Sequence, residues 1–380
     1  MATFPYAAEF PVDPEIIYLN HAGVGPWPKR TQDAVTAFAC ENVSRGAARY
    51  LDWMAVEAGL KARLAAFINA AGPDDIALLK NTSEGLSMVA AGLPLRAGDN
   101  VVLADQEFPS NRIPWEALAS RGVEVRVARL DVEDPEAALI RQLDERTRVL
   151  AVSAVQYATG LRMDLARLGA AARANGTLFC VDAIQQLGAL CFDMQAVQAD
   201  VVVADAHKWL LAPEGTALFC TRADARAAIA PTQFGWHMVE HAGDFSRRDW
   251  QPAQSARRYE SGSPNMLGIH ALSASLSFFE EAGMQEIEQR VLANAGYLAG
   301  RIAALPGWSL VSRRDAARFC SGIVTVRHAS GEHGALYRQL RSQGVVCIER
   351  GGGIRLSPHA WLDEGQLARA VDCFARLAGC

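Results

Sequence analysis

The chain has 380 residues, of which 50% are hydrophobic and 21% are charged, and its formal net charge at pH 7 is −5. That length suits two or three domains, and the composition excludes a disordered, a collagen-like or a small disulfide-stapled protein. Because the net charge is mildly negative and no basic block is present, the sequence gives no electrostatic basis for binding nucleic acid.

The ends and the cysteines bear on where the protein works. No Lys or Arg precedes Lys29, so we expect no secretory signal, and no apolar stretch has the length of a membrane helix. The eight cysteines include no C-x-x-C pair and no zinc spacing. Several lie in apolar runs, where a free cysteine behaves as a small hydrophobe. We therefore expect a soluble, cytoplasmic protein.

Strand-like and helical patterns alternate through the first part of the chain. Because the strand-like runs are apolar throughout, they suit a sheet covered on both faces. Strand–helix alternation predicts a doubly wound, mainly parallel α/β sheet that binds its ligands at the carboxyl ends of the strands. The expected strands are 75–80, 100–105, 123–128, 148–155, 177–183, 200–205 and 216–220, and expected helices include 111–120, 135–143 and 164–174.

The rhythm changes after about residue 255. A long helical pattern with breaks covers 267–305, and a closing helix is expected at 363–377. Between them lie three strand-like segments, SGIVTVRH, VVCIER and GIRLSP. These elements predict a smaller α+β unit, and neither a repeat nor a flexible linker is evident.

The segment DVVVADAHKWLLAPEG (200–215) places Lys208 just after a buried-type strand and before an apolar run. The chain has only four lysines, so one in an apolar setting calls for an explanation. Loss of solvation lowers the pKa of such an ammonium and yields a neutral amine that can form a Schiff base. The alternative, on residue type alone, is an ordinary surface lysine at a strand end.

Two further segments fit a Schiff-base lysine. In TLFCVDAIQQLG (177–188), Asp182 can keep the ring nitrogen of pyridoxal phosphate (PLP) protonated, and Gln185 can donate to the cofactor's phenolic oxygen. In LLKNTSEGLSM (78–88), a helix beginning near Glu84 offers its free N–H groups and two hydroxyls to a phosphate. The alternatives are helix capping by Asp182 and an ordinary capping motif before Glu84.

In this order and spacing, the segments resemble the class V aminotransferase family of fold type I PLP enzymes, which includes cysteine desulfurases and isopenicillin N epimerase-like proteins. The resemblance spans nearly the whole chain. It is carried by LNHAGVGPWP (19–28), NTSEGL, DQEFPSNRIPW (105–115), VDAIQQLG, ADAHKWLLAPEG, YESGSPN (259–265) and IRLSPHAW (354–361).

The resemblance implies a role for each matching residue. Lys208 and Asp182 would be catalytic, and Arg355 would grip the substrate α-carboxylate as a bidentate fork, with Asn20 and Gln156 as further substrate contacts. Ser263 would reach the PLP phosphate of the neighbouring subunit in a homodimer. The cofactor contacts would be Thr82, Ser83, Phe108, Asp182, Gln185, Asp205, His207, Lys208 and Ser263.

The resemblance also implies an architecture: a mainly parallel seven-stranded sheet flanked by helices, with a smaller C-terminal α+β domain. We expect an N-terminal segment (1–20) that packs with the small domain, a large PLP-binding α/β domain (21–255) and the small domain (256–380). PLP is the expected cofactor, and an amino acid the expected substrate.

Departures from the family bear on the reaction. Cysteine desulfurases place a histidine over the PLP ring, where this chain has Phe108, and they carry a nucleophilic cysteine on a mobile loop, whereas Cys347 lies in a strand-like run. Ala154 stands where desulfurases have an asparagine, a contact that Gln156 would have to replace. We therefore predict a class V aminotransferase. The alternatives are a C–S lyase or desulfurase-like β-elimination enzyme and a non-catalytic PLP-binding scaffold.

Two other patterns are weaker. GWHMVEH (235–241) matches an H-x-x-E-H metal motif through His237, Glu240 and His241, but the flanking Pro231 and Gly243 favour a loop, so we predict no metal site. The loop is expected to line the substrate entrance. The run at 351–353, GGG, is not followed by a helix and does not predict a phosphate-binding loop.

Overall fold

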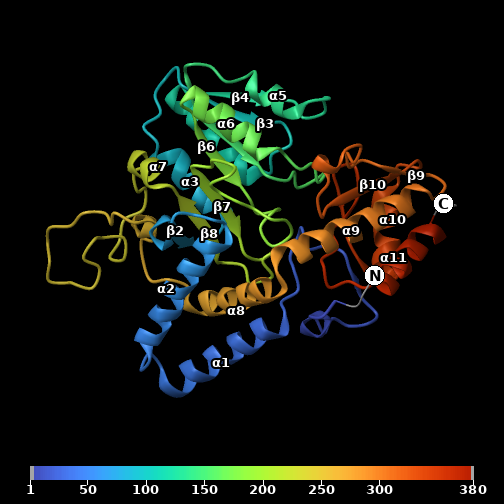
Figure 1. Cartoon of the computed structure of the whole chain (residues 1–380), viewed down its shortest axis with the longest axis horizontal. Coiled ribbons are helices and arrows are strands. Elements are labelled where there is room, and N and C mark those ends of the chain that lie inside the picture. The colour runs from blue at the N-terminus through green and yellow to red at the C-terminus, as the bar shows by residue number, and fades with distance from the viewer. Residues whose placement is uncertain (1–3, 378–380) are drawn as a thin grey trace.

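Seven strands form one central sheet. The computed structural model describes residues 4–377, and the strand order is β2-β8-β7-β6-β5-β3-β4. Only β8 is antiparallel to its neighbours, so the other six point the same way (Figure 1). These are the seven predicted strands: β2 (Ile76–Leu79), β3 (Asn100–Ala104), β4 (Glu124–Ala128), β5 (Thr147–Ser153), β6 (Leu178–Asp182), β7 (Val201–Asp205) and β8 (Ala217–Thr221).

The sheet separates two hydrophobic cores. Val101 and Leu103 point into one, and the alternating Val102 and Ala104 point into the other. Helices α3 and α4 cover the first face, and α2, α5, α6 and α8 contribute to the core on the second. A sheet buried on both faces explains why its strands are apolar throughout. These helices are α2 (Tyr50–Phe67), α3 (Thr82–Gly92), α4 (Ile113–Glu116), α5 (Pro135–Ile140), α6 (Leu165–Asn175) and α8 (Met266–Ala282).

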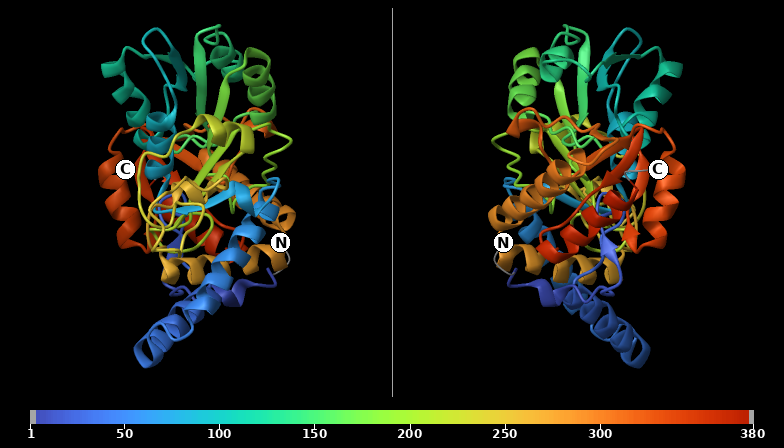
Figure 2. Two further views of the ribbon diagram at one scale, coloured as in Figure 1. Left: turned by 90° about the vertical axis from the view of Figure 1, so that its left-hand side faces the viewer. Right: turned by 90° about the vertical axis from the view of Figure 1, so that its right-hand side faces the viewer.

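A second, antiparallel sheet in the order β12-β13-β10-β9 lies beside the first, in orange and red in Figures 1 and 2. The predicted helical stretch is two helices that break at Gly283, whose φ of 78° favours glycine. The elements of this part are α9 (Met284–Ala303), β9 (Trp308–Leu310), β10 (Val324–His328), α10 (His333–Ser342), β11 (Val345–Val346), β12 (Ile348–Arg350), β13 (Gly353–Leu356) and α11 (Glu364–Arg376).

A segment from the first part of the chain pairs with the C-terminal part. Strand β1 (Ile17–Tyr18) pairs in parallel with β11, and Asn20 forms a bridge with Ser357. Residues 17–20 therefore run along the C-terminal part. The predicted domain boundaries at 20 and 255 stay a prediction.

Two long helices project from the body. Helix α1 (Lys29–Arg45) and α2 both pack on α8 and extend away from the sheet, in blue at the bottom of Figure 2. One short helix, α7 (Ala223–Ala228), follows β8, and short 3-10 turns fill several connections. Across residues 4–377, no helix is long and apolar enough to cross a membrane.

Candidate active site

A cavity of about 480 Å³ opens where the parallel strands end. Asp182 and Asp205 are the last residues of β6 and β7, and Ser153 is the last of β5, so all three reach the same edge of the sheet. The cavity brings together ten of the twelve predicted site residues: Asn20, Thr82, Ser83, Phe108, Asp182, Gln185, Asp205, His207, Lys208 and Arg355.

Lys208 lies in the loop after β7, with its Nζ atom 5.6 Å from the centre of the Phe108 ring. Burial lowers the pKa of its ammonium to about 8 from 10.5, and the nearby positive charges of Arg355 and Arg350 act in the same direction, against the carboxylate of Asp182. The amine is therefore neutral over a larger part of the physiological pH range than an exposed lysine would be. A neutral amine is the form that attacks an aldehyde.

The loop that follows Asn20 holds in place the loop that carries Lys208. The N–H group of Gly25 donates to the carbonyl of His207 at 2.8 Å. A Cβ atom at Gly25 would lie 2.2 Å from the backbone oxygen of Lys208, so the two loops approach more closely than any side chain permits. The position of the Lys208 backbone depends on this contact.

We expect Gly25→Ala to destabilise the protein by about 1–3 kcal/mol, because the new methyl group overpacks a contact between two backbones. Thermal unfolding should register the loss as a lower Tm, together with weaker retention of any ligand bound at Lys208. Gly300→Ala is the matched control, since a Cβ atom there, on the exposed face of α9, meets nothing within 4 Å. An equal Tm for Gly25→Ala and Gly300→Ala would contradict the prediction.

Asp182 is 2% exposed, and its Oδ1 accepts a hydrogen bond from the N–H of Ile184 at 3.0 Å. Burial is the main reason that its pKa is raised. No lysine, arginine or histidine of residues 4–377 forms an ion pair with it within 4.0 Å, although it faces the cavity. A buried carboxylate in this situation is suited to a cationic group supplied by a ligand.

The amide of Gln185 has a fixed orientation. Its Oε1 accepts a hydrogen bond from Trp209 Nε1 at 2.8 Å, and its Nε2 donates to the carbonyl of Ala22 at 3.0 Å. The second Nε2 proton is left for a ligand in the cavity. Trp209, which is fully buried, therefore sets which end of this amide faces the site.

Donors for an anion gather at the start of α3. Asn81 caps this helix by accepting from Glu84 N–H, so the helix begins at Thr82 and not near Glu84 as predicted. Thr82 Oγ1 accepts from the Asp205 N–H, which leaves its own proton free, and Ser83 Oγ lies 2.7 Å from Ser110 Oγ. The helix N-terminus adds backbone N–H groups and a favourable dipole.

Arg355 lies at the other side of the cavity and is 1% exposed. Its Nη1 donates to the carbonyl of Tyr157 at 2.6 Å, and its Nη2 donates to Asn20 Oδ1 at 3.4 Å. Its Nε is buried without a hydrogen-bond partner. A guanidinium with neutral partners only is a ready site for a carboxylate.

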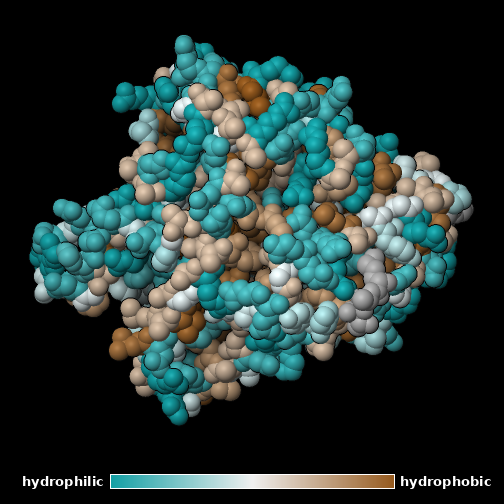
Figure 3. Space-filling view, in the orientation of Figure 1, coloured by the Kyte–Doolittle hydropathy of each residue, from teal (hydrophilic) through white to brown (hydrophobic). Residues whose placement is uncertain are grey.

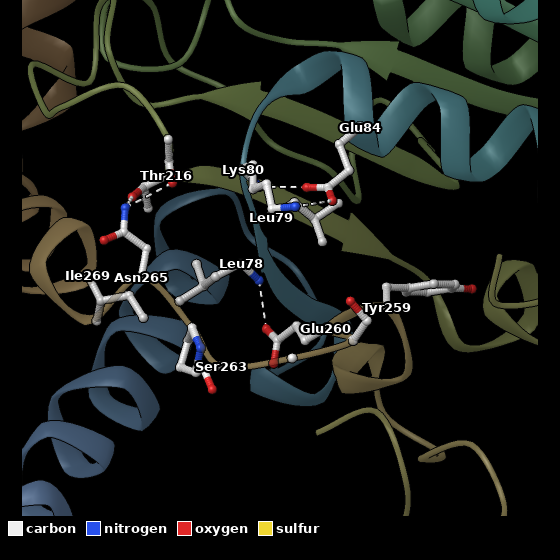
Figure 4. A pocket seen from close by; sticks show the side chains of 14 residues that line it. Leu78, Leu79, Lys80, Glu84, Thr216, Tyr259, Glu260, Ser263, Asn265 and Ile269 are labelled. Carbon is white, nitrogen blue, oxygen red and sulfur yellow. Dashed lines mark hydrogen bonds and ion pairs between the residues drawn. The ribbon is translucent and has the colours of Figure 1, made fainter. Parts of the chain in front are cut away.

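Two predicted residues lie outside this cavity. Gln156 is fully buried, and its Nε2 donates to Glu107 at 3.3 Å, so it faces the protein interior and its substrate contact stays a prediction. Ser263 lines a second cavity of about 200 Å³ together with Lys80, Glu84 and Glu260 (Figure 4). Within one chain it does not reach Lys208's cavity, and its contact with a neighbouring subunit also stays a prediction.

Several residues that line the cavity were not predicted from the sequence. Ser153 is the last residue of β5 and Tyr157 lies beyond it, but only the pairing of β5 with β6 brings them to the site. Arg350 ends the strand-like run VVCIER, and no pattern in that run marks it as a site residue. The cavity-lining residues that were missed include Ser110, Ser153, Tyr157, Glu214 and Arg350.

The H-x-x-E-H segment lies in a loop, as predicted. His237 approaches Glu260 (Nδ1 to Oε2, 3.6 Å) and Glu57, which is not a pairing within the motif. The donor atoms of these three side chains lie within 4.8 Å of one another, but the ammonium of Lys61 contacts both carboxylates at 2.8 Å. A lysine therefore already supplies the cation at this cluster.

The family model described as Aminotransferase class-V matches residues 17–372. A probable cysteine desulfurase of Methanothermobacter thermautotrophicus is 28% identical, with 100% of this chain and 99% of the relative covered. The isopenicillin N epimerase of Streptomyces clavuligerus is also 28% identical, covering 97% and 96%.

Solved structures agree on the fold. The cystine C–S lyase C-DES, solved in complex with its product cysteine persulfide, superposes with a TM-score of 0.89 at 24% identity, covering 96% of this chain and 99% of that one. At this level of identity, the likeness shows that the two chains share a fold.

Proposed function

The chain belongs to the class V aminotransferase family of fold type I enzymes, and on that premise we propose that it is a PLP-dependent C–S lyase acting on an amino acid. PLP is the cofactor of this family. The observation that carries the proposal is the convergence, in one cavity, of a lysine with a lowered pKa, an unpaired buried carboxylate and an unpaired arginine: Lys208, Asp182 and Arg355.

The residues present fit PLP. The Lys208 amine would bind the PLP aldehyde, and the Asp182 carboxylate would accept a hydrogen bond from the protonated ring nitrogen. At the phosphate end, the Thr82 hydroxyl has a free proton, and the contact of His207 Nδ1 with Asp205 Oδ1 at 3.0 Å would leave the other ring nitrogen of His207 for a phosphate oxygen. Phe108 would cover one face of the ring.

When bound, PLP withdraws electrons from the Cα atom of the amino acid attached to it. Arg355 would hold the α-carboxylate of the substrate and so orient the Cα–H bond. The Lys208 amine would then remove the Cα proton, since its lowered pKa keeps a neutral fraction available. Asp182 would keep the ring nitrogen protonated, and the buried walls of the cavity would exclude water.

Similarity to curated relatives favours C–S cleavage over the transamination that the sequence alone led us to predict, and the cysteines then decide which form of C–S cleavage we propose. The relative from Methanothermobacter thermautotrophicus, which matches the full length of the chain, is named as a probable cysteine desulfurase. The seven described cysteines do not line the cavity, and burial raises the pKa of Cys347 to about 12, so no thiol is poised to receive sulfur. We therefore propose β-elimination. The C–S electron pair and a proton leave with the sulfur as a thiol, and addition of water to the remainder yields pyruvate and ammonium.

The test incubates the PLP-loaded protein with L-cysteine, L-cystine, a cysteine S-conjugate and other L-amino acids, with no keto-acid acceptor. Repeated release of pyruvate with a thiol or sulfide is expected. Conversion of the cofactor to pyridoxamine phosphate, with one keto acid per site, would instead identify an aminotransferase. If no amino acid reacted or changed the cofactor spectrum, the scaffold interpretation would replace both.

We also propose that the working form is a homodimer, in which Ser263 approaches the partner's cofactor phosphate. Exposed apolar side chains support a surface that a second copy of the chain covers. Leu51 and Met54 of α2 are 79% and 47% exposed. Figure 3 shows hydrophobic residues over the outer end of α2, at the lower left. Further exposed aromatic residues lie in the loop between α7 and α8: Phe234, Trp236, Phe245 and Trp250.

A further inference from the structure

Two arginines line the cavity, and both contact the same residue. Arg355 lies on β13 and Arg350 at the end of the neighbouring antiparallel strand β12, opposite Gly353. Arg355 donates to the Tyr157 carbonyl at 2.6 Å, whereas the guanidinium carbon of Arg350 lies 5.5 Å from the centre of the Tyr157 ring. The two cations therefore flank Tyr157 at the same wall of the site.

Neither guanidinium has an anionic partner. Within residues 4–377, no carboxylate lies within 4.0 Å of either group, and Arg350 makes no hydrogen bond through its side chain. Other arginines of the described chain do have a carboxylate partner, as Arg167 does with Asp134. Three acidic residues line the cavity: Asp182, Asp205 and Glu214.

Two unpaired like charges in one partly buried cavity are costly unless a ligand supplies the opposite charges. The positive charge of Arg350 is strong enough at the site to lower the pKa of both Lys208 and Arg355. One carboxylate neutralises one guanidinium. A substrate with only an α-carboxylate would leave one of the two arginines without a partner.

We propose that Arg350 binds a second carboxylate, carried by the side chain of the substrate, while Arg355 binds the α-carboxylate. The substrate class is then an amino acid with a carboxylate at each end. For a C–S lyase, this means a disulfide or thioether whose leaving thiol carries the second carboxylate. The inference rests on the proposed function only in assigning the α-carboxylate to Arg355.

The first experiment measures binding to the PLP-loaded protein by calorimetry, with butyrate and valerate against succinate, glutarate and adipate. We expect at least one dicarboxylate to bind tenfold or more tightly than the monocarboxylates, and Arg350→Gln to remove that preference. Arg338→Gln, an exposed arginine of α10, is the matched control and should retain it. Equal binding of the two series, or an unchanged preference in Arg350→Gln, would overturn the proposal.

Kinetics supply the second readout. Arg350→Gln removes a positive charge near Lys208 and should affect both substrates alike through that lysine, but kcat/KM should fall at least tenfold further for L-cystine than for S-methyl-L-cysteine, which has one carboxylate, with the extra loss in KM. Equal losses on both substrates would assign Arg350 a structural role and refute the proposal. Thermal unfolding of the variant checks that the fold is intact.

The two proposals fail separately. A protein that transaminates but prefers dicarboxylates would keep the role of Arg350 and remove the lyase assignment. A protein that eliminates thiols without such a preference would keep the lyase assignment and remove the role of Arg350.

Discussion

Replacing Lys208 with alanine is expected to lower turnover on the order of 10⁴-fold or more, because the variant loses both the amine that binds the cofactor and the base at Cα. Steady-state release of pyruvate measures the effect, with cofactor content determined by absorbance. Lys29→Ala is the control, since the ammonium of Lys29 is exposed and pairs with Asp33 on the surface of α1. Retained turnover in Lys208→Ala would rule out the assignment of this lysine.

The same lysine predicts a dependence of stability on pH in the protein without cofactor. The pKa of Lys208 is about 8 in the folded chain, below the 10.5 of an exposed lysine, so the unfolded chain binds more protons between these values. The charged Lys208 therefore lowers the free energy of unfolding by its full amount below about pH 8, and this effect disappears as the pH rises toward 10.5. Relative to Lys208→Ala, the wild-type protein should gain stability over that window in denaturant titrations.

Asp182→Asn is expected to reduce kcat by about 10²–10³-fold, because an amide keeps the shape of the side chain but cannot hold a protonated ring nitrogen. Without cofactor, the variant should be no less stable than the wild-type protein, since burial already disfavours the charged carboxylate. Comparison of kcat with the Tm of the cofactor-free protein separates the two effects.

The matched control is Asp200→Asn at the opposite end of the same sheet. Asp200 precedes β7, and its Oδ2 accepts from the N–H of Phe179, far from the edge where Asp182 lies. This variant should keep kcat within about threefold. A loss of kcat in Asp200→Asn as large as that in Asp182→Asn would mean that the effect arises from the sheet and not from the ring nitrogen.

The large sheet was predictable because its strands are buried on both faces. Runs such as VVLA and VVVA leave little choice of conformation, and every predicted strand lies in the sheet. The direction of β8 was not predictable, because nothing in its residues distinguishes an antiparallel strand from a parallel one. Helices α1 and α2 were not predicted. Their exposed apolar residues, such as Val43 and Leu51, blur the amphipathic pattern that identifies a surface helix.

The position of a site residue was predictable where the residue lies at or just after the end of a strand, as Asp182, Asp205 and Lys208 do. Arg355 was identified through the family resemblance. The substrate contact of Gln156 stays a prediction, and its Nε2 donates to Glu107 within this chain. Arg350 could not be identified, because its position depends on how β12 pairs with β13 and not on its own neighbours.

The wall of the cavity joins residues from both ends of the chain. Asn20 accepts a hydrogen bond from Arg355, and the N–H of Ala22 donates to Ser357 Oγ. The N–H of Gly25 donates to the carbonyl of His207, in the loop that carries Lys208. During synthesis, Lys208 emerges from the ribosome well before Arg355, and the loop around Asn20 has no C-terminal partner until then. Until β13 has been made, Lys208 therefore lacks both the burial and the neighbouring guanidinium charges that lower its pKa, and the pocket cannot form.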